Sequence, residues 1–273
     1  MDDVRIIRPP SRIPKLDLGE VLRSRELLWV FVRRGIFARY RQMALGIFWS
    51  LLEPLGLLIM MSVVFGMILR VPTGGFPYPI FVFSALIPWL YFSKAVNGTA
   101  SSLHENIAII SKIYFPRVLL PLSALMREMF DSLMLFVLLV VLAWIYGFPP
   151  SWKLLLMPIV LLYLSIPALG IGLSVAAISI RYRDFRPMLA LVLQAGFYVT
   201  PILYPVALVP EIARPIYMAN PVYWGVEFSR WIILDQPMTL HPSLIVSLLI
   251  CAGLLIAGYY IFASYEREAV DVQ

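Results

Sequence analysis

The feature that most constrains the fold is the long apolar run from Gly46 to Leu69, in which Glu53 is the single charged residue. At a rise of about 1.5 Å per residue, a helix of this length crosses a hydrocarbon core of about 30 Å. Basic residues beside a span favour the cytoplasmic side, and the run is preceded by Arg33, Arg34, Arg39 and Arg41. The sequence therefore predicts a first membrane span over 46–69 that starts at the cytoplasm, and the direction of each later span follows from it.

The composition agrees with a membrane protein. Hydrophobic residues make up 61% of the 273 residues and charged residues 14%, whereas a soluble domain carries about 25% charged residues. The net charge of +6 lies mostly beside the apolar runs, where it attracts anionic lipid head groups, so it does not indicate nucleic-acid binding. The one cysteine, Cys251, lies inside an apolar run and is interpreted as a small core residue. The predicted fold class is an all-α membrane protein.

Apolar runs separated by polar or Pro- and Gly-rich connections predict six transmembrane helices. Their expected bounds are 46–69, 79–97, 124–146, 153–180, 187–204 and 243–264. They form a predicted transmembrane domain over 44–264, with a basic, proline-containing cytoplasmic arm over 1–16 and a polar cytoplasmic tail over 265–273. In this order most Lys and Arg residues fall on the inner side, so the positive-inside rule places both termini in the cytoplasm.

Residues 17–43 are predicted to form an amphipathic helix that lies in the membrane interface before the first span. One helical face carries Leu28, Phe31, Val32 and Ile36, while most of the arginines lie elsewhere. The alternative is a charged flank that only stops translocation. The arm over 1–16 matches no pattern that indicates a function.

The segment Ser101–Pro116 between the second and third expected spans is predicted to be a surface helix. Ser102 and Glu105 have the spacing of a capping box, so a helix should begin there, and Pro116 should end it. The segment is too short and too polar for a span, and adjacent spans need a far shorter linker. We therefore expect a cytoplasmic amphipathic helix that docks a partner; the alternative is a plain linker helix.

The longest expected outer connection, Pro205–Leu240, is rich in aromatic residues. Their spacing suggests a short helix with an aromatic face, formed by Tyr223, Trp224, Phe228 and Trp231. One interpretation is a set of interfacial aromatic residues that anchor the helix at the lipid–water boundary. The other is a lid over an exit whose rings stack on sugars.

Several polar groups fall near or inside the expected spans, where charges are costly and need partners. They are Glu53, Arg127, Glu128, Asp131 and Gln194. Arg127 and Asp131 are four residues apart, so a local ion pair is the simplest expectation. Glu53 has no local partner and is expected to face a protein interior or a wet path. On the fourth expected span, the small residues Ala168, Gly172 and Ala176 share a face that permits close helix packing.

No site for ATP or a metal is predicted in this chain. The sequence has no G-x-x-x-x-G-K-[ST] phosphate loop and no H-E-x-x-H motif, and its two histidines, His104 and His241, lie far apart.

Six blocks occur in the same order as in a known family. They are RYRQMALGIFWSLLEPL, FPYPIFVFSALIPWLYF, SKIYFPRVLLPLSAL, ISIRYRDFR, TPILYP with the following LVPE, and NPVYWGVEFSRWIIL. From about residue 26 onward the chain resembles the type-2 permease subunits of ABC-type polysaccharide exporters, which move O-antigen, capsule or teichoic acid chains. The resemblance implies a bacterial inner-membrane homodimer, paired with two copies of a separate ATPase that binds ATP and Mg. Its substrate would be a lipid-linked polysaccharide.

The resemblance also implies roles for individual residues. The helix between the second and third spans would couple to the ATPase, with the RYRDFR turn as a second contact, which assigns His104, Glu105, Asn106, Lys112, Tyr114, Phe115, Arg183 and Asp184 to that interface. We expect Tyr114 and Phe115 to anchor the helix against the spans. The first and fifth spans would line the channel with Phe48, Trp49, Glu53, Phe65, Gln194, Phe197, Tyr198 and Tyr204. The outer gate would comprise Tyr223, Trp224, Phe228 and Trp231.

Three other functions compete with this interpretation. The nearest is a type-2 ABC permease for drugs or small lipids, which the order of the six blocks disfavours. A membrane enzyme acting on an isoprenoid-linked substrate would need clustered carboxylates or a metal motif, which Glu128 and Asp131 alone do not supply. A proton-driven carrier would need a longer relay than Glu53 and Asp131 provide.

Overall fold

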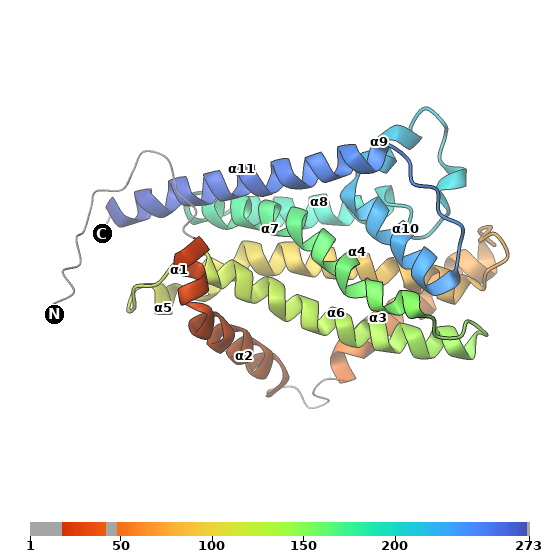
Figure 1. Cartoon of the computed structure of the whole chain (residues 1–273), viewed down its shortest axis with the longest axis horizontal. Helices are drawn as coiled ribbons and strands as arrows, with labels where there is room; N and C mark the ends of the chain where they lie inside the picture. The colour runs from red at the N-terminus through yellow and green to blue at the C-terminus, as the bar shows by residue number, and fades with distance from the viewer. Residues whose placement is uncertain (1–17, 42–47, 272–273) are drawn as a thin grey trace.

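The computed structural model describes residues 18–41 and 48–271, and within them the chain is helical, with turns and loops but no strands (Figure 1). The helices before the core are α1 (Leu18–Arg23) and α2 (Arg25–Arg41). The long helices are α3 (Phe48–Met61), which continues as the π-helical η1 (Ser62–Ile68), α4 (Tyr78–Glu105), α6 (Leu119–Ile145), α7 (Met157–Arg181) and α11 (Ser243–Asp271). The shorter ones are α5 (Ile107–Ile110), η2 (Trp152–Leu156), α8 (Phe185–Val199), η3 (Val206–Leu208), α9 (Arg214–Ala219) and α10 (Pro221–Leu234).

In this part of the chain, five helices are long and apolar enough to cross a membrane. They cover Ser50–Ile68, Tyr78–Glu105, Leu119–Ile145, Trp152–Arg181 and Ser243–Tyr265. Each coincides with a predicted span, although the second and third extend further at the end near α5 than the apolar runs indicated. The second helix is longer because the polar residues after Asn97 continue it, and the third already starts at Leu119.

The expected fifth span over 187–204 is shorter in the structure. It forms α8, which at about 1.5 Å per residue is about 22 Å long and does not reach across a core of about 30 Å by itself. The helix ends because Thr200 precedes Pro201, and a residue before proline is pushed into the extended conformation that Thr200 has here. The chain nevertheless returns through α8 and the loop after it to the end of the molecule that carries α9 (Figure 1).

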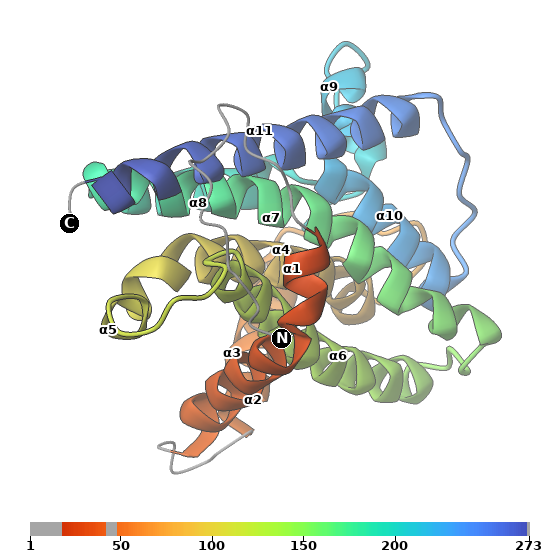
Figure 2. The ribbon, with the colours of Figure 1, turned by 60° about the vertical axis from the view of Figure 1, so that its left-hand side comes forward.

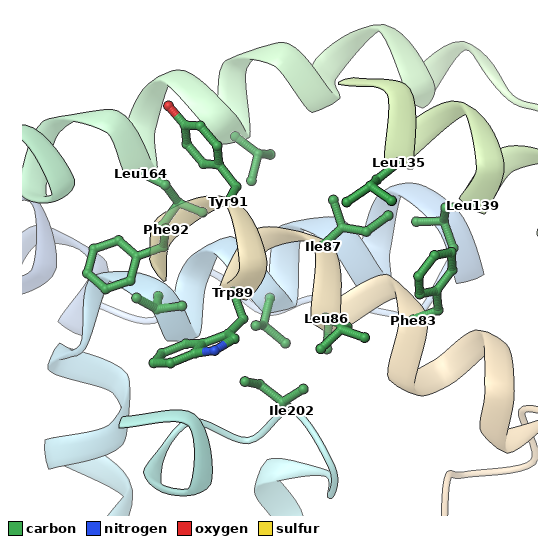
Figure 3. Close-up of a cluster of buried hydrophobic side chains, with 14 of the residues drawn as sticks. Phe83, Leu86, Ile87, Trp89, Tyr91, Phe92, Leu135, Leu139, Leu164 and Ile202 are labelled. Carbon is green, nitrogen blue, oxygen red and sulfur yellow. The ribbon is translucent and has the colours of Figure 1, made fainter. Parts of the chain in front are cut away.

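Helix α4 lies at the centre of the molecule and packs against α3, α6, α7, α8 and α10. Figure 3 shows side chains of α4 that face α6, α7 and the loop after α8 in turn, among them Phe83, Ile87 and Tyr91. Most of this helix is buried, whereas α3 and α11 are largely exposed. A helix that is apolar all round and covered by its neighbours forms the core on which the others are placed.

Pro88 lies inside α4, as the sequence required, and leaves the carbonyl of Ser84 without its helical donor. The Ser229 hydroxyl of α10 donates a hydrogen bond to that carbonyl at 2.6 Å. A side chain from a neighbouring helix thus satisfies the group that proline frees, which is how membrane helices tolerate internal prolines. The same bond fixes α10 on α4.

Close approach between helices depends on small residues of α7. The predicted stripe Ala168, Gly172 and Ala176 is buried, and a Cβ atom on Gly172 would lie 1.7 Å from Oγ1 of Thr99 in α4. Another face of α7 meets α11, which runs beside it in Figure 1 and Figure 2. There a Cβ on Gly258 would lie 2.0 Å from the main-chain oxygen of Gly170, so the two backbones touch.

We therefore expect Gly258→Ala to separate α7 from α11 and to lower the melting temperature of the purified protein. Overpacking a tight contact costs about 1–3 kcal/mol, and more where backbone rather than a side chain must move. Gly253→Ala is the matched control on the same helix, because nothing lies within 4 Å of a Cβ at that position. Equal melting temperatures for the two variants would contradict the backbone contact.

Candidate functional site

The predicted surface helix over Ser101–Pro116 is not present as expected. Helix α4 runs on to Glu105, and Ser102 donates a hydrogen bond to the carbonyl of Thr99 at 2.7 Å, so it lies inside a helix and caps none. The helix ends at Asn106, whose side-chain amide donates to the carbonyl of Ser102 at 2.8 Å. Only the short α5 follows, and the chain from Ser111 to Pro116 is not helical. The capping-box pattern misled because Ser102 and Leu103 are buried and extend the packed face of α4.

A cleft of about 480 Å³ lies between this segment and the turn from α7 to α8; we call it the inner cleft. Its lining combines apolar and basic side chains and comprises Leu103, His104, Ile107, Ile110, Arg117, Ser179, Ile180, Arg183 and Arg186. The structure thus brings His104 and Arg183, predicted from two separate stretches of sequence, to one place.

The other predicted ATPase contacts are arranged differently. Phe115 is buried and its ring lies 5.3 Å from that of Phe31 in α2, whereas Tyr114 is 89% exposed. The expectation that Tyr114 anchors the segment against the spans is therefore wrong, because its neighbour occupies the apolar position. Lys112 and Asp184 are exposed, and Glu105 accepts a hydrogen bond from Ser101 at 2.7 Å.

A charged cluster joins α2 to α6, and we call it the α2 clasp: Arg39, Tyr40, Arg127, Glu128 and Asp131. Arg39 pairs with Glu128 at 2.6 Å and also with Asp131, to which Tyr40 donates a hydrogen bond at 2.6 Å. Arg127 pairs with Glu128 at 3.3 Å. The predicted local pair of Arg127 with Asp131 does not form, because α2 supplies a better-placed guanidinium.

The electrostatics of the clasp follow from the burial of its carboxylates. The side chains of Glu128 and Asp131 are 2% and 9% exposed, so each needs a cation or a hydrogen-bond donor. Burial would lower the pKa of Arg39, but Glu128 and Asp131 raise it above its ordinary value, so the guanidinium stays charged. Burial, and then the bond to Asp131, raises the pKa of Tyr40 to about 12, so its hydroxyl keeps the proton that it donates.

Two further clefts adjoin the clasp. One, of about 430 Å³, lies between α3, α4 and α6 and contains Glu53, whose side chain is 65% exposed and pairs with Lys94 at 3.2 Å. Glu53 thus has a partner on α4 that sequence spacing could not indicate. The other, of about 400 Å³, lies under α2 against the inner ends of α4 and α6.

The predicted channel residues of α3 and α8 divide into packed and exposed side chains. Phe65 is half-buried against the core, and Phe197 is half-buried with its ring 5.8 Å from that of Trp89. Gln194 and Tyr198 are exposed on α8, and the Tyr204 hydroxyl donates to the Tyr198 carbonyl at 2.8 Å. Phe48 and Trp49 begin α3, but their side chains lie outside the described part of the structure.

The aromatic residues of the outer connection belong to α10, which packs against α4 and α7. Asn220 caps this helix by accepting a hydrogen bond from the Val222 amide at 3.0 Å. Tyr223 and Trp224 are buried, whereas Phe228 and Trp231 are half-buried against the core. In this chain the aromatic residues therefore hold α10 in place more than they face solution.

Two arginines have roles that the sequence did not suggest. Arg230, expected on the outer side, is buried over the ring of Phe81 at 3.9 Å and pairs with Glu227. Arg39 was expected only as a flanking charge. Arg230 has a local partner in Glu227, but its burial over Phe81 joins distant parts of the chain, as do the pairs of Arg39 with Glu128 and Asp131, so sequence spacing does not indicate these contacts. No cluster of His, Cys, Asp and Glu suited to a metal ion occurs among the residues that the structure describes.

Comparison with known proteins relates this geometry to a family. Residues 26–234 match the family model described as ABC-2 type transporter. The chain is 30% identical over 254 residues to an O-antigen export system permease protein RfbA of Myxococcus xanthus, covering 92% of this chain and 97% of that protein. It is 29% identical over 264 residues to an RfbA of Klebsiella pneumoniae, covering 94% and 98%. It is also 24% identical over 202 residues to the polysialic acid transport protein KpsM of Escherichia coli, covering 72% and 77%.

Proposed function

Since this chain belongs to the ABC-2 type transporter family, we propose that it is the membrane permease of an exporter that moves a lipid-linked polysaccharide across the bacterial inner membrane. The observation that carries the proposal is the similarity along more than nine-tenths of the chain to permeases named for O-antigen export. The weaker similarity to a polysialic acid transport protein supports a polysaccharide over a drug or a small lipid. The chain is a transport subunit, not an enzyme.

A separate ATPase powers the transport, and two copies of it bind ATP and Mg outside this chain. The sequence contains no phosphate loop that would let the permease bind ATP in that way. The inner cleft is the docking place that we propose, because it combines apolar side chains with His104 and Arg183 at one end of the molecule. An interface of this kind draws its energy from buried anchors within a polar rim.

Six crossings with both termini in the cytoplasm complete the proposed topology. The described end of α11 lies at the same end of the molecule as α1 and α5, and α9 lies at the opposite end (Figure 1). The fifth crossing would comprise α8 and the residues to Tyr204, of which Thr200, Ile202 and Leu203 are buried by the chain itself. Basic residues of the turn after α7, including Arg181 and Arg183, lie at the α5 end, in agreement with the positive-inside rule.

The proposed path runs between α3 and α8 of two copies of the chain. Glu53 and Gln194 are exposed on these helices at positions where lipid would be a costly neighbour. A second copy that faces both helices would place these polar groups along a hydrated path. The outer end would then be bounded by α10.

Tyr198→Ala is expected to slow export without affecting folding, because this exposed ring would lose its stacking contacts with passing sugars. Aromatic contacts are worth about 0.5–1.5 kcal/mol, so we expect a roughly 2- to 10-fold lower rate of glycan export. Tyr260→Ala, a tyrosine of similar exposure on α11, outside the proposed path, is the control. Export at the parental rate by Tyr198→Ala, at equal protein level, would exclude this residue from the path.

Deletion of the gene tests the proposed function. We expect loss of one polysaccharide from the cell surface, with accumulation of its lipid-linked form at the inner membrane, and restoration by the wild-type gene. Unchanged surface glycans together with altered resistance to small molecules would contradict the proposal and favour a drug permease.

A further inference from the structure

The cavity under α2 has an unusual lining for a helix expected at the membrane interface. We call it the arginine cavity; its volume is about 400 Å³, within the range of small-ligand sites. It is lined by Phe31, Arg34, Gly35, Ala38, Arg39, Glu105, Asn106, Leu120, Ser123 and Arg127. The lining thus holds three guanidinium groups and one carboxylate, together with the polar Asn106 and Ser123 and a few apolar residues.

The charged residues of the cavity differ in how many of their hydrogen-bonding groups already have partners. Arg39 is held by Glu128 and Asp131, and Glu105 accepts a bond from Ser101. Arg34 is exposed, and no hydrogen bond or ion pair to it occurs within the described residues. Arg127 binds Glu128 through Nε, which leaves the two terminal nitrogens of its guanidinium for another acceptor. The free donors therefore belong to Arg34 and Arg127.

The fold places these two arginines together. Arg127 extends from α6 beneath α2, and its Nη1 would lie only 3.1 Å from a Cβ on Gly35. Glycine at this position lets the guanidinium lie against the backbone of α2, directly beside Arg34 in the sequence. A larger residue there would displace Arg127 from the cavity wall.

We propose that the arginine cavity binds the phosphate group of a membrane lipid, with Arg34 and Arg127 as the two ligating side chains. Guanidinium groups donate paired hydrogen bonds that match phosphate oxygens, and the positive charge of Arg34 is paired with no carboxylate among the described residues. The apolar residues Phe31, Ala38 and Leu120 suit the first carbons beyond such a head group. One source of the phosphate is the lipid diphosphate of the glycan substrate, and this source rests on the proposed function. The other source is an anionic phospholipid.

Native mass spectrometry of the full-length chain in phosphatidylcholine nanodiscs tests this site. The two probes are a polyprenyl diphosphate and phosphatidylglycerol, titrated separately. We expect saturable binding of one lipid per chain, weakened about 10-fold by Arg34→Gln because a charged hydrogen-bond donor is lost. Arg34→Lys should weaken lipid binding less than Arg34→Gln, since lysine keeps the positive charge but lacks the paired donors of a guanidinium group. The matched control is Arg33→Gln, which removes the neighbouring charge from outside the cavity, where Arg33 lies 5.5 Å from the centre of the Phe37 ring.

Each outcome decides between the possibilities. Preferential binding of the diphosphate supports a substrate site, and preferential binding of phosphatidylglycerol supports a site for a resident lipid. Equal affinity of the wild type, Arg34→Gln and Arg33→Gln for both lipids, or equal loss in the two variants, would overturn the site. Because wild-type export is measured separately, failure of lipid binding leaves the permease function intact, and failure of export leaves the binding result intact.

Discussion

Replacing Arg39 with glutamine is expected to detach α2 from α6 and to destabilise the protein by about 3 kcal/mol. The substitution leaves the nearly buried carboxylates of Glu128 and Asp131 without their main cation. We place the effect at the lower end of the usual range for a broken buried pair because the Arg39 side chain is itself 30% exposed.

A thermal-stability series separates this loss of pairing from a general effect of removing charge. Arg39→Gln should melt well below the parent, while Arg39→Gln combined with Glu128→Gln and Asp131→Asn should recover part of the loss, because no nearly buried carboxylate then remains without a cation. Arg25→Gln, an exposed position at the other end of α2, is the control. A triple variant no more stable than Arg39→Gln alone would mean that the clasp is not what holds α2.

Phe115→Ala is expected to uncouple transport from ATP hydrolysis. Phe115 is buried against Phe31 of α2, so its removal loosens the segment that joins α5 to α6 beside the inner cleft. Truncation of a buried phenylalanine costs about 3–5 kcal/mol of stability. If only about 1.4 kcal/mol of this is lost from the docked state of the segment, the coupling of ATP hydrolysis to transport falls about tenfold.

The measurement is substrate-stimulated ATPase activity of the assembled transporter in lipid. Lys112→Ala is the control, because an exposed rim charge contributes little to an interface. We expect stimulation to fall sharply in Phe115→Ala and to persist in Lys112→Ala. Similar stimulation in both variants would mean that the segment does not transmit the ATPase motion.

The lengths of the apolar runs predicted most of the fold, because a helix that crosses a membrane must match the thickness of its hydrocarbon core. The five long spans and the small-residue face of α7 could be located from the sequence alone. The fifth expected span could not, because one residue pair, Thr200 and Pro201, ends α8 while the apolar pattern continues. The prediction of a separate surface helix was wrong because a helix continued where the pattern indicated a new start: the capping-box residues Ser102 and Glu105 belong to the packed helix α4.

The candidate site was less predictable because its contacts join distant parts of the chain. Local spacing suggested that Arg127 pairs with Asp131, but α2 brings Arg39 to both carboxylates. The aromatic pattern of α10 identified a helix without showing that Tyr223 and Trp224 are buried in it. His104 and Arg183, which were predicted from two separate stretches of sequence, line one cleft, and their contact with an ATPase stays a prediction.

Transport by purified components in proteoliposomes shows whether this chain is the permease of an ATP-driven polysaccharide exporter. The chain is reconstituted alone, with its ATPase, and with an ATPase variant that cannot hydrolyse ATP, and the transfer of a lipid-linked polysaccharide across the bilayer is followed. We expect transfer only with the active ATPase and ATP, and no ATP hydrolysis by the chain alone. Enzyme-rate ATP hydrolysis by the chain alone, or equal transfer with the inactive ATPase, would contradict this function.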